Sequence, residues 1–212
     1  MEVKINKKLI DSGIYVVINP AIDEQVLFEK LQIILTKDIA AVQIWDNFKS
    51  GQNVEELLEK IHSLCKKHQT PVLINNRWDY LKTIDLDGIH FDQIPANLDQ
   101  IKKEVDSGLI FGLTCENDLA DVRWAAGNDF DYISFCAMFP SESAGDCEIV
   151  DHQTVEEASR IFDNPLFLSG GISPENLPEL DNLKFDGVAV ISGIMNAKNP
   201  DQAIDQYLKN LK

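Results

Sequence analysis

The sequence predicts an α/β fold and, within that class, a (β/α)8 TIM barrel. Eight short apolar runs of strand length alternate with segments of helical periodicity along the 212 residues. Each run is apolar on both faces, as strands of a buried parallel sheet are. An open doubly wound sheet would usually carry a glycine-rich turn after its first strand, where this chain has Asn19-Pro20. We therefore expect a single barrel domain spanning residues 1–212.

The first half of the chain contains four strand–helix units. Apolar runs predict strands at residues 14–18, 40–45, 72–74 and 88–91. The first helix has an apolar face formed by Val26, Leu27, Leu31, Ile34 and Leu35. The second helix, over residues 54–68, repeats that spacing at Leu57, Leu58, Ile61, Leu64 and Cys65. A short helix around residues 80–84 and a helix over residues 98–105 complete this half.

The second half repeats the pattern four times. Its strands are expected at residues 109–113, 132–135, 166–169 and 187–191. Helices are expected at residues 117–126, which Gly127 ends, and at residues 155–162 and 200–211. Ser173 as an N-cap and Pro174 in the first turn predict a helix between the last two strands. Residues 138–152 form the longest irregular segment.

Charge is the strongest signal in the composition. The 19 basic and 35 acidic residues give a net charge of −16, which repels a nucleic-acid backbone and anionic lipid. Residues 1–8 are polar, and no apolar run approaches the ~18 residues that a membrane span needs. The cysteines and histidines lack the spacing of a zinc site or a disulfide framework. We therefore expect a cytoplasmic protein with no nucleic-acid or membrane partner and no metal site of that kind.

The last two strands end in small residues. Ser169, Gly170 and Gly171 follow the seventh strand, and Ser192 and Gly193 follow the eighth. Glycine leaves backbone N–H groups open to an anion, and barrels commonly bind phosphate on the loops after these two strands. Two ordinary turns are the alternative. The position in the barrel favours a phosphate site, and the segment from Ser192 is expected to open a short helix beside it.

The other strand ends carry polar side chains, namely Gln43, Trp45, Asp46, Asn75, Asn76, Arg77, His90, Asp92, Gln93, Thr114, Cys115, Glu116, Ser141, Glu142 and Ser143. Gln43 and Thr114 have the alternative of satisfying backbone groups of the barrel rim. For Arg77 the alternative is an ion pair with Asp79, and for Trp45 it is packing against other side chains. For Cys136 the alternative is a role as a small core residue. Together these ends predict an amide- and hydroxyl-rich mouth, suited to a small phosphorylated heterocycle and lacking an obvious acid–base dyad.

The order VQIWDN, LINNR, DGIHFDQ, FGLT, FPSES, SGGI and DGVAVISGI resembles the thiamine-phosphate synthase superfamily, which includes a thiazole tautomerase paralogue. The resemblance implies a transferase of thiamine biosynthesis. Such an enzyme joins aminopyrimidine methyl pyrophosphate to hydroxyethylthiazole phosphate and releases pyrophosphate through a dissociative, Mg-assisted step. The resemblance also implies a possible homodimer.

Site roles follow from the resemblance. It places the thiazole phosphate on Gly170, Gly171, Ile191, Ser192 and the neighbouring Gly193. Gln43 would contact the pyrimidine or its pyrophosphate. The pyrophosphate pocket would be lined by Asn75, Asn76, Arg77 and Thr114, with Arg77 and Thr114 as the catalytic residues. Ser141 and Ser143 stand where the superfamily has two loop threonines.

The departures from the superfamily pattern lie on the pyrophosphate side. Its Gln-x-Arg-x-Lys reads Gln43-Ile-Trp45-Asp-Asn47, and its Asn-Asp-Arg reads Asn75-Asn76-Arg77. The second Mg aspartate, the loop lysine and the histidine after the fifth strand are replaced by Pro95, Ala144 and Glu116. Mg thus remains possible, with its ligand positions substituted. The catalytic histidine of the tautomerase would fall at Ala137 or Met138.

Three functions stay open. The first is a synthase, weakened by these substitutions. The second is a related enzyme acting on thiazole phosphate with other catalytic groups, such as Glu116, Asp92 or Cys136. The third is a non-catalytic binder or regulator that keeps only the thiazole-phosphate site.

Overall fold

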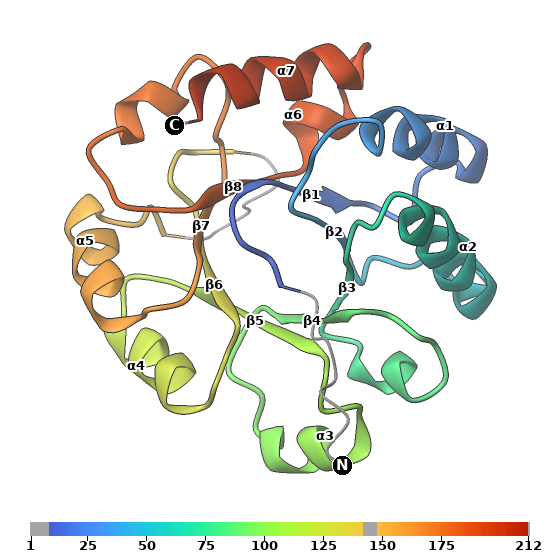
Figure 1. Ribbon diagram of the computed structural model, residues 1–212, viewed down its shortest axis with the longest axis horizontal. Helices are drawn as coiled ribbons and strands as arrows, with labels where there is room; N and C mark the ends of the chain where they lie inside the picture. Colours follow the sequence, from blue (N-terminus) through green and yellow to red (C-terminus); the bar gives the residue numbers. More distant parts are fainter. Residues whose placement is uncertain (1–8, 142–147, 212) are drawn as a thin grey trace.

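The computed structural model describes residues 9–141 and 148–211. Eight parallel strands form a closed barrel in which each strand pairs with the next and β1 pairs with β8 (Figure 1). This confirms the predicted (β/α)8 barrel. The strands are β1 (Gly13–Ile18), β2 (Ala41–Ile44), β3 (Val72–Asn75), β4 (Gly88–Phe91), β5 (Ile110–Cys115), β6 (Tyr132–Cys136), β7 (Leu166–Ser169) and β8 (Gly187–Val190).

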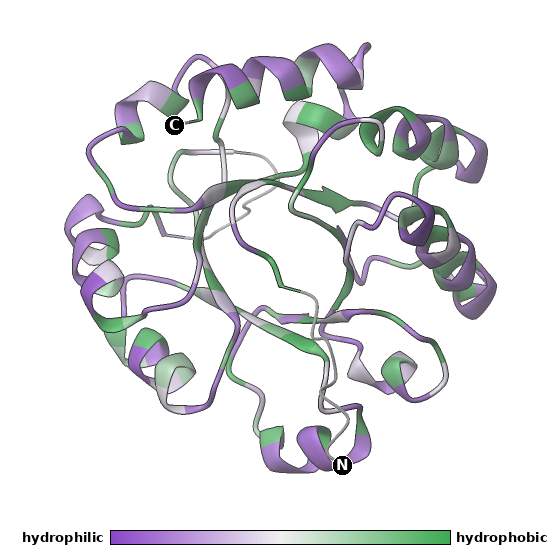
Figure 2. Cartoon of the chain, in the orientation of Figure 1, coloured by the Kyte–Doolittle hydropathy of each residue, from purple (hydrophilic) through white to green (hydrophobic). Residues whose placement is uncertain are grey.

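Helices form a ring around the barrel (Figure 1). Their hydrophobic residues face the strands and their hydrophilic residues face outward, as the colouring of Figure 2 shows. They are α1 (Glu24–Ile34), α2 (Val54–Lys67), η1 (Trp78–Lys82), α3 (Leu98–Glu104), α4 (Leu119–Gly127), α5 (His152–Ile161), η3 (Leu177–Leu180), α6 (Ser192–Met195) and α7 (Pro200–Asn210). None of the described helices is long and apolar enough to cross a membrane.

Two expectations about the helices are wrong. The helix expected from Ser173 is instead a turn followed by the 3₁₀ helix η3. Asn176 explains the difference, because its side chain accepts from the Ser173 N–H at 2.7 Å and donates to the Gly171 carbonyl at 2.9 Å. In α1, Val26 is 41% exposed although Leu27, Leu31 and Ile34 are buried. The apolar stripe of α1 is therefore narrower than the sequence suggests.

The core has two layers. The larger lies between the barrel wall and the helices, and the smaller fills the barrel itself. Tyr15, Tyr132 and Phe167 meet inside the barrel, with ring centroids 5.8 Å apart in each pair. These rings fill the interior of the barrel, as side chains do in this fold. The hydroxyl groups of Tyr15 and Tyr132 are polar groups within this largely apolar layer.

Candidate functional site

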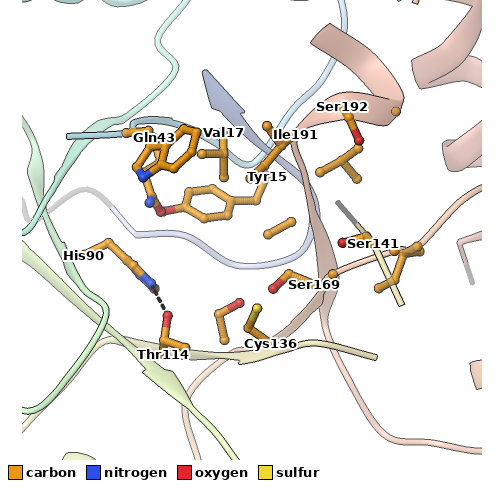
Figure 3. Close-up of a pocket in the computed structure, with 18 of the residues that line it drawn as sticks. Tyr15, Val17, Gln43, His90, Thr114, Cys136, Ser141, Ser169, Ile191 and Ser192 are labelled. Carbon is orange, nitrogen blue, oxygen red and sulfur yellow. Dashed lines mark hydrogen bonds between the residues drawn. The ribbon is translucent and has the colours of Figure 1, made fainter. Parts of the chain in front are cut away.

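A cavity of about 590 Å³ opens at the C-terminal ends of the strands. Residues from all eight strands or the loops that follow them line it, together with Tyr207 of α7. Figure 3 shows Gln43, Tyr15 and His90 on one side of this cavity, with Ser141 and Ser192 on the other. The cavity is thus one continuous space shared by the predicted phosphate loops and the polar strand ends.

The loops after β7 and β8 form one corner of the cavity. Gly170 and Gly171 have φ angles of +83° and +68°, a backbone region that favours glycine. A Cβ atom on Gly171 would lie 2.5 Å from the carbonyl oxygen of Phe139. No hydrogen bond joins the Gly171 N–H to any other described residue. The N–H groups of Ser192 and Gly193 begin α6 and have no intrahelical acceptor. These three N–H groups can receive an anion.

Tyr207 connects helix α7 to this corner of the cavity. Its hydroxyl donates to the Ile172 carbonyl oxygen at 2.8 Å, which ties α7 to the loop after β7. A Cβ atom on Gly193 would approach the same hydroxyl to 2.2 Å, so any other residue there would have to displace Tyr207. Burial raises the pKa of Tyr207 to about 12, so its hydroxyl remains protonated as a donor at neutral pH. The phosphate corner is therefore built by three separate parts of the chain.

Five side chains form a hydrogen-bonded series across the opposite side of the cavity, which we call the buried relay. The Tyr15 hydroxyl donates to Gln43 Oε1 and lies 2.7 Å from the Tyr132 hydroxyl. His90 Nδ1 lies 2.8 Å from the Tyr132 hydroxyl, and His90 Nε2 lies 2.8 Å from Thr114 Oγ1 (Figure 3). The relay thus connects Gln43 on β2 with Thr114 on β5.

The relay is uncharged. Burial lowers the pKa of His90 to about 4, because the cationic imidazolium would lose its hydration inside the barrel. Burial likewise raises the pKa of both tyrosine hydroxyls well above its usual value. Near pH 7 the relay therefore contains a neutral imidazole between protonated hydroxyl groups, and none of its members supplies a charge to a ligand.

Amides and carboxylates meet beside the relay. Asn75 Nδ2 donates to Asp92 Oδ1 at 2.9 Å, and Asn76 Nδ2 donates to Asp92 Oδ2 at 2.8 Å. Asn76 Nδ2 also lies 3.1 Å from Asp46 Oδ2. An N–H donor thus stands between the two carboxylates, where a bound cation would need an oxygen ligand. The described residues hold no cluster of three His, Cys, Asp or Glu side chains, and the Asn76 amide, which stands in place of a Mg aspartate of the superfamily, donates to the two carboxylates instead of offering an oxygen ligand between them.

Arg77 pairs with a neighbour in the chain. Its Nε donates to Asp79 Oδ1 at 2.9 Å, and its guanidinium lies 4.5 Å from the centre of the Tyr80 ring. Arg77 and Asn76 are absent from the described lining of the cavity, which contains no lysine or arginine. The pairing with Asp79, which the sequence left open, is the one that forms. The charged residues of the described lining are Asp92 and Glu116, so that side of the cavity is acidic.

The remaining predicted site residues divide clearly. The cavity brings together Gln43, Asn75, Thr114, Ser141, Gly170, Gly171, Ile191, Ser192 and Gly193. Ser143 lies outside the described residues, as do Glu142 and Ala144. Ala137 and Met138 are buried, and neither offers the histidine of a tautomerase. Cys136 lines the cavity rather than the apolar core.

The sequence analysis did not predict Tyr15, Tyr132 and Tyr207, although polar rings on two buried strands were a signal for the first two.

These features define the class of protein: a (β/α)8 barrel with one large cavity at its C-terminal mouth and glycine-rich loops after β7 and β8. The family model described as thiamine monophosphate synthase matches residues 14–194, more than half of the chain. The chain belongs to this family.

Two relatives agree with this assignment, and a solved structure shares the fold. The chain is 29% identical to the thiamine-phosphate synthase of Methanobrevibacter smithii over 96% of its own length and 97% of that protein. It is 30% identical to the thiamine-phosphate synthase of Picrophilus torridus over 72% of its own length and 74% of that protein. Thiamine phosphate pyrophosphorylase from Pyrococcus furiosus has a similar fold, with a TM-score of 0.80 at 21% identity, covering 93% of this chain and 94% of that one.

Proposed function

We propose that this protein binds a small heterocyclic phosphate monoester of thiamine biosynthesis, with hydroxyethylthiazole phosphate as the leading candidate. The observation that carries the proposal is the corner formed by Gly171, Ser192 and Gly193. Its N–H groups lack acceptors within the described residues, and side chains would not fit at either glycine. A phosphate monoester offers several oxygen acceptors to such a corner without needing a cationic side chain.

The heterocycle would extend from this corner toward the relay. Ile191, Val17 and Trp45 offer apolar surface in the same cavity, and Gln43 and Thr114 offer polar groups beyond it. An apolar wall with a few convergent polar groups is the usual composition of a small-molecule site. The ligand class is therefore a ring with a phosphate at one end and hydrogen-bonding groups at the other.

Coupling of this phosphate to aminopyrimidine methyl pyrophosphate is the second candidate function, favoured by the curated relatives named thiamine-phosphate synthase. In that reaction the C–O bond to pyrophosphate breaks, and the thiazole nitrogen forms the new C–N bond. The departing pyrophosphate needs cations to stabilise its charge. Trp45 and Asn47 replace two of them, Arg77 is paired with Asp79, and Asp92 and Glu116 add negative charge. The described cavity thus supports binding better than it supports coupling.

One pair of measurements tests both functions. Calorimetric titration with hydroxyethylthiazole phosphate and with the unphosphorylated alcohol measures how much affinity the phosphate contributes. We expect binding of the phosphate and at least tenfold weaker binding of the alcohol, since charged hydrogen bonds contribute about 1.5–3 kcal/mol each. Equal affinities would refute the phosphate corner.

Turnover is measured separately with both substrates and Mg²⁺, as pyrophosphate release. Release that disappears in Thr114→Val and in Gly171→Asp would establish the synthase at this site. Binding of thiazole phosphate without release of pyrophosphate would instead support a non-catalytic binding protein. Arg77→Ala is informative in the same assay, because loss of turnover in that variant would place Arg77 in the reaction despite its pairing with Asp79.

A further inference from the structure

The buried relay has a direction that follows from counting protons. The single proton of the Tyr15 hydroxyl is donated to Gln43 Oε1, so the bond between the two tyrosines must be donated by Tyr132. Tyr132 then has no proton left for His90, and His90 Nδ1 must carry one and donate it. A neutral imidazole has only one proton, so Nε2 accepts from the Thr114 hydroxyl.

This direction determines what the two ends offer to the cavity. Gln43 uses its carbonyl oxygen inside the relay, so its NH₂ group is free to donate to a ligand. Thr114 uses its proton inside the relay, so its oxygen lone pairs are free to accept. The opposite direction, with every bond reversed, would keep the same heavy-atom positions. It needs a flipped Gln43 amide and the proton of His90 on Nε2, and Gln43 then offers an acceptor while Thr114 offers a donor.

We propose that the interior members of the relay are positioning residues that couple the Gln43 amide to the Thr114 hydroxyl. They are Tyr15, Tyr132 and His90. Through them, the two ends offer a ligand one donor and one acceptor, in either of two opposite settings, and the setting at one end determines the setting at the other. That these two ends meet a ligand rests on the proposed function, because it takes the cavity as the ligand site, whereas the coupling itself does not depend on it.

The residues of the relay are buried and closely packed. Tyr15, Tyr132, Gln43 and His90 are between 0% and 5% exposed. The tyrosine rings pack against Phe167, and the His90 ring stacks on Tyr132 with centroids 5.6 Å apart. A buried hydroxyl that loses its partner costs about 1–3 kcal/mol. A change at one end is therefore accommodated by reversing neighbouring bonds rather than by leaving one of them unmade.

The test is ¹⁵N NMR of the imidazole groups in the full chain without ligand, with the His90 signals assigned through His90→Gln. In the wild type we expect His90 to be neutral at pH 7 with its proton on Nδ1. Gln43→Met keeps the length of the side chain but removes the acceptor at the far end of the relay. The Tyr15 hydroxyl then donates to Tyr132, and Tyr132 donates to His90 Nδ1, so we expect the Nδ1–H form to be largely replaced by the Nε2–H form. Gln43→Glu restores an acceptor and should restore the Nδ1–H form.

Tyr15→Phe is a second, shape-preserving way to cut the relay and should have the same effect as Gln43→Met. Tyr80→Phe makes the same chemical change outside the cavity and should leave His90 as in the wild type. A His90 tautomer that is unchanged in both Gln43→Met and Tyr15→Phe would overturn the proposed coupling. Titration of the wild type with hydroxyethylthiazole phosphate keeps the proposed function separate. A chain that fails to bind it but shows the tautomer change supports the coupling and refutes the function.

Discussion

Asn76 and Asp92 hold each other through two hydrogen bonds. The Asn76 amide donates to Asp92 Oδ2 at 2.8 Å, and its carbonyl oxygen accepts from the Asp92 backbone N–H at 3.0 Å. The same amide nitrogen lies 3.1 Å from Asp46 Oδ2. Asn76 thus bridges two carboxylates at the point where the family resemblance implies a Mg ligand.

Asn76→Asp should convert this bridge into a cluster of three carboxylates. The positive φ of 55° at Asn76 is tolerated by aspartate, so the backbone is expected to keep its path. Without metal, we expect a loss of about 1–3 kcal/mol in the free energy of unfolding, from like-charge repulsion and the lost donor. With 10 mM Mg²⁺ the variant should recover stability, while the wild type should not respond. Thermal unfolding with and without Mg²⁺ measures both effects, and an equal response of the two proteins would contradict this account.

Trp45→Arg should strengthen pyrophosphate binding. Trp45 lines the acidic side of the cavity, whose described lining contains no lysine or arginine. One added cation near a bound anion is expected to contribute about 1–2 kcal/mol at this partly buried position, which is roughly a tenfold gain in affinity. The affinity for inorganic pyrophosphate is measured by calorimetry at two ionic strengths, and the gain should shrink in high salt.

Trp78→Arg is the matched control for that experiment. It places the same charge on η1, outside the main cavity, and should leave pyrophosphate affinity near the wild-type value. If both variants bind pyrophosphate equally well, the gain reflects the net charge of −16 rather than the cavity. If neither binds better than the wild type, the missing cation is not what limits pyrophosphate binding.

The barrel was predictable because each strand is buried on both faces and leaves a run of apolar residues. The bounds of β4 and β7 match the expectation residue for residue. The replacement of the expected helix by the 3₁₀ helix η3 was not predictable from Ser173 and Pro174. Those signals are local, and the bonds of Asn176 to Ser173 and Gly171 compete with the first helical turn.

The site was predictable where position along a strand decides it. Gln43, Asn75, Thr114 and the loop glycines follow from the rule that strand ends meet at one mouth. The partner of Arg77 was not predictable, since a carboxylate two residues away competes with any ligand. The relay was also hidden, because the contact between Tyr15 and Tyr132 joins residues 117 positions apart.

Gly171→Ala should remove the phosphate site. The new Cβ would meet the Phe139 carbonyl oxygen at 2.5 Å, and the φ of +68° is strained for alanine. We expect at least a tenfold loss of affinity for hydroxyethylthiazole phosphate and a loss of about 1–3 kcal/mol in unfolding free energy. Gly51→Ala is the matched control, because Gly51 has a φ of +77° but open space around its Cβ position. That variant should lose a little stability and no affinity. Comparable affinity losses in the two variants would show that the Gly171 contact is not specific to the phosphate corner.

His90 should make stability depend on pH between its ordinary pKa and its value in the fold. Burial lowers the His90 pKa from 6.5 to about 4, so between these pH values the unfolded chain binds a proton that the folded chain does not. Stability from the neutral imidazole is thus fully present above pH 6.5 and is lost as the pH falls toward 4. The loss is at most about 3 kcal/mol.

Urea unfolding of the wild type and His90→Gln at pH 7.5 and 4.5 isolates this contribution, because other groups titrate alike in both proteins. We expect the wild type to lose more stability than His90→Gln, and the exposed control His68→Gln to follow the wild type. Parallel losses in the wild type and His90→Gln would mean that His90 accepts a proton in the fold as readily as in the unfolded chain, which a neutral relay does not allow.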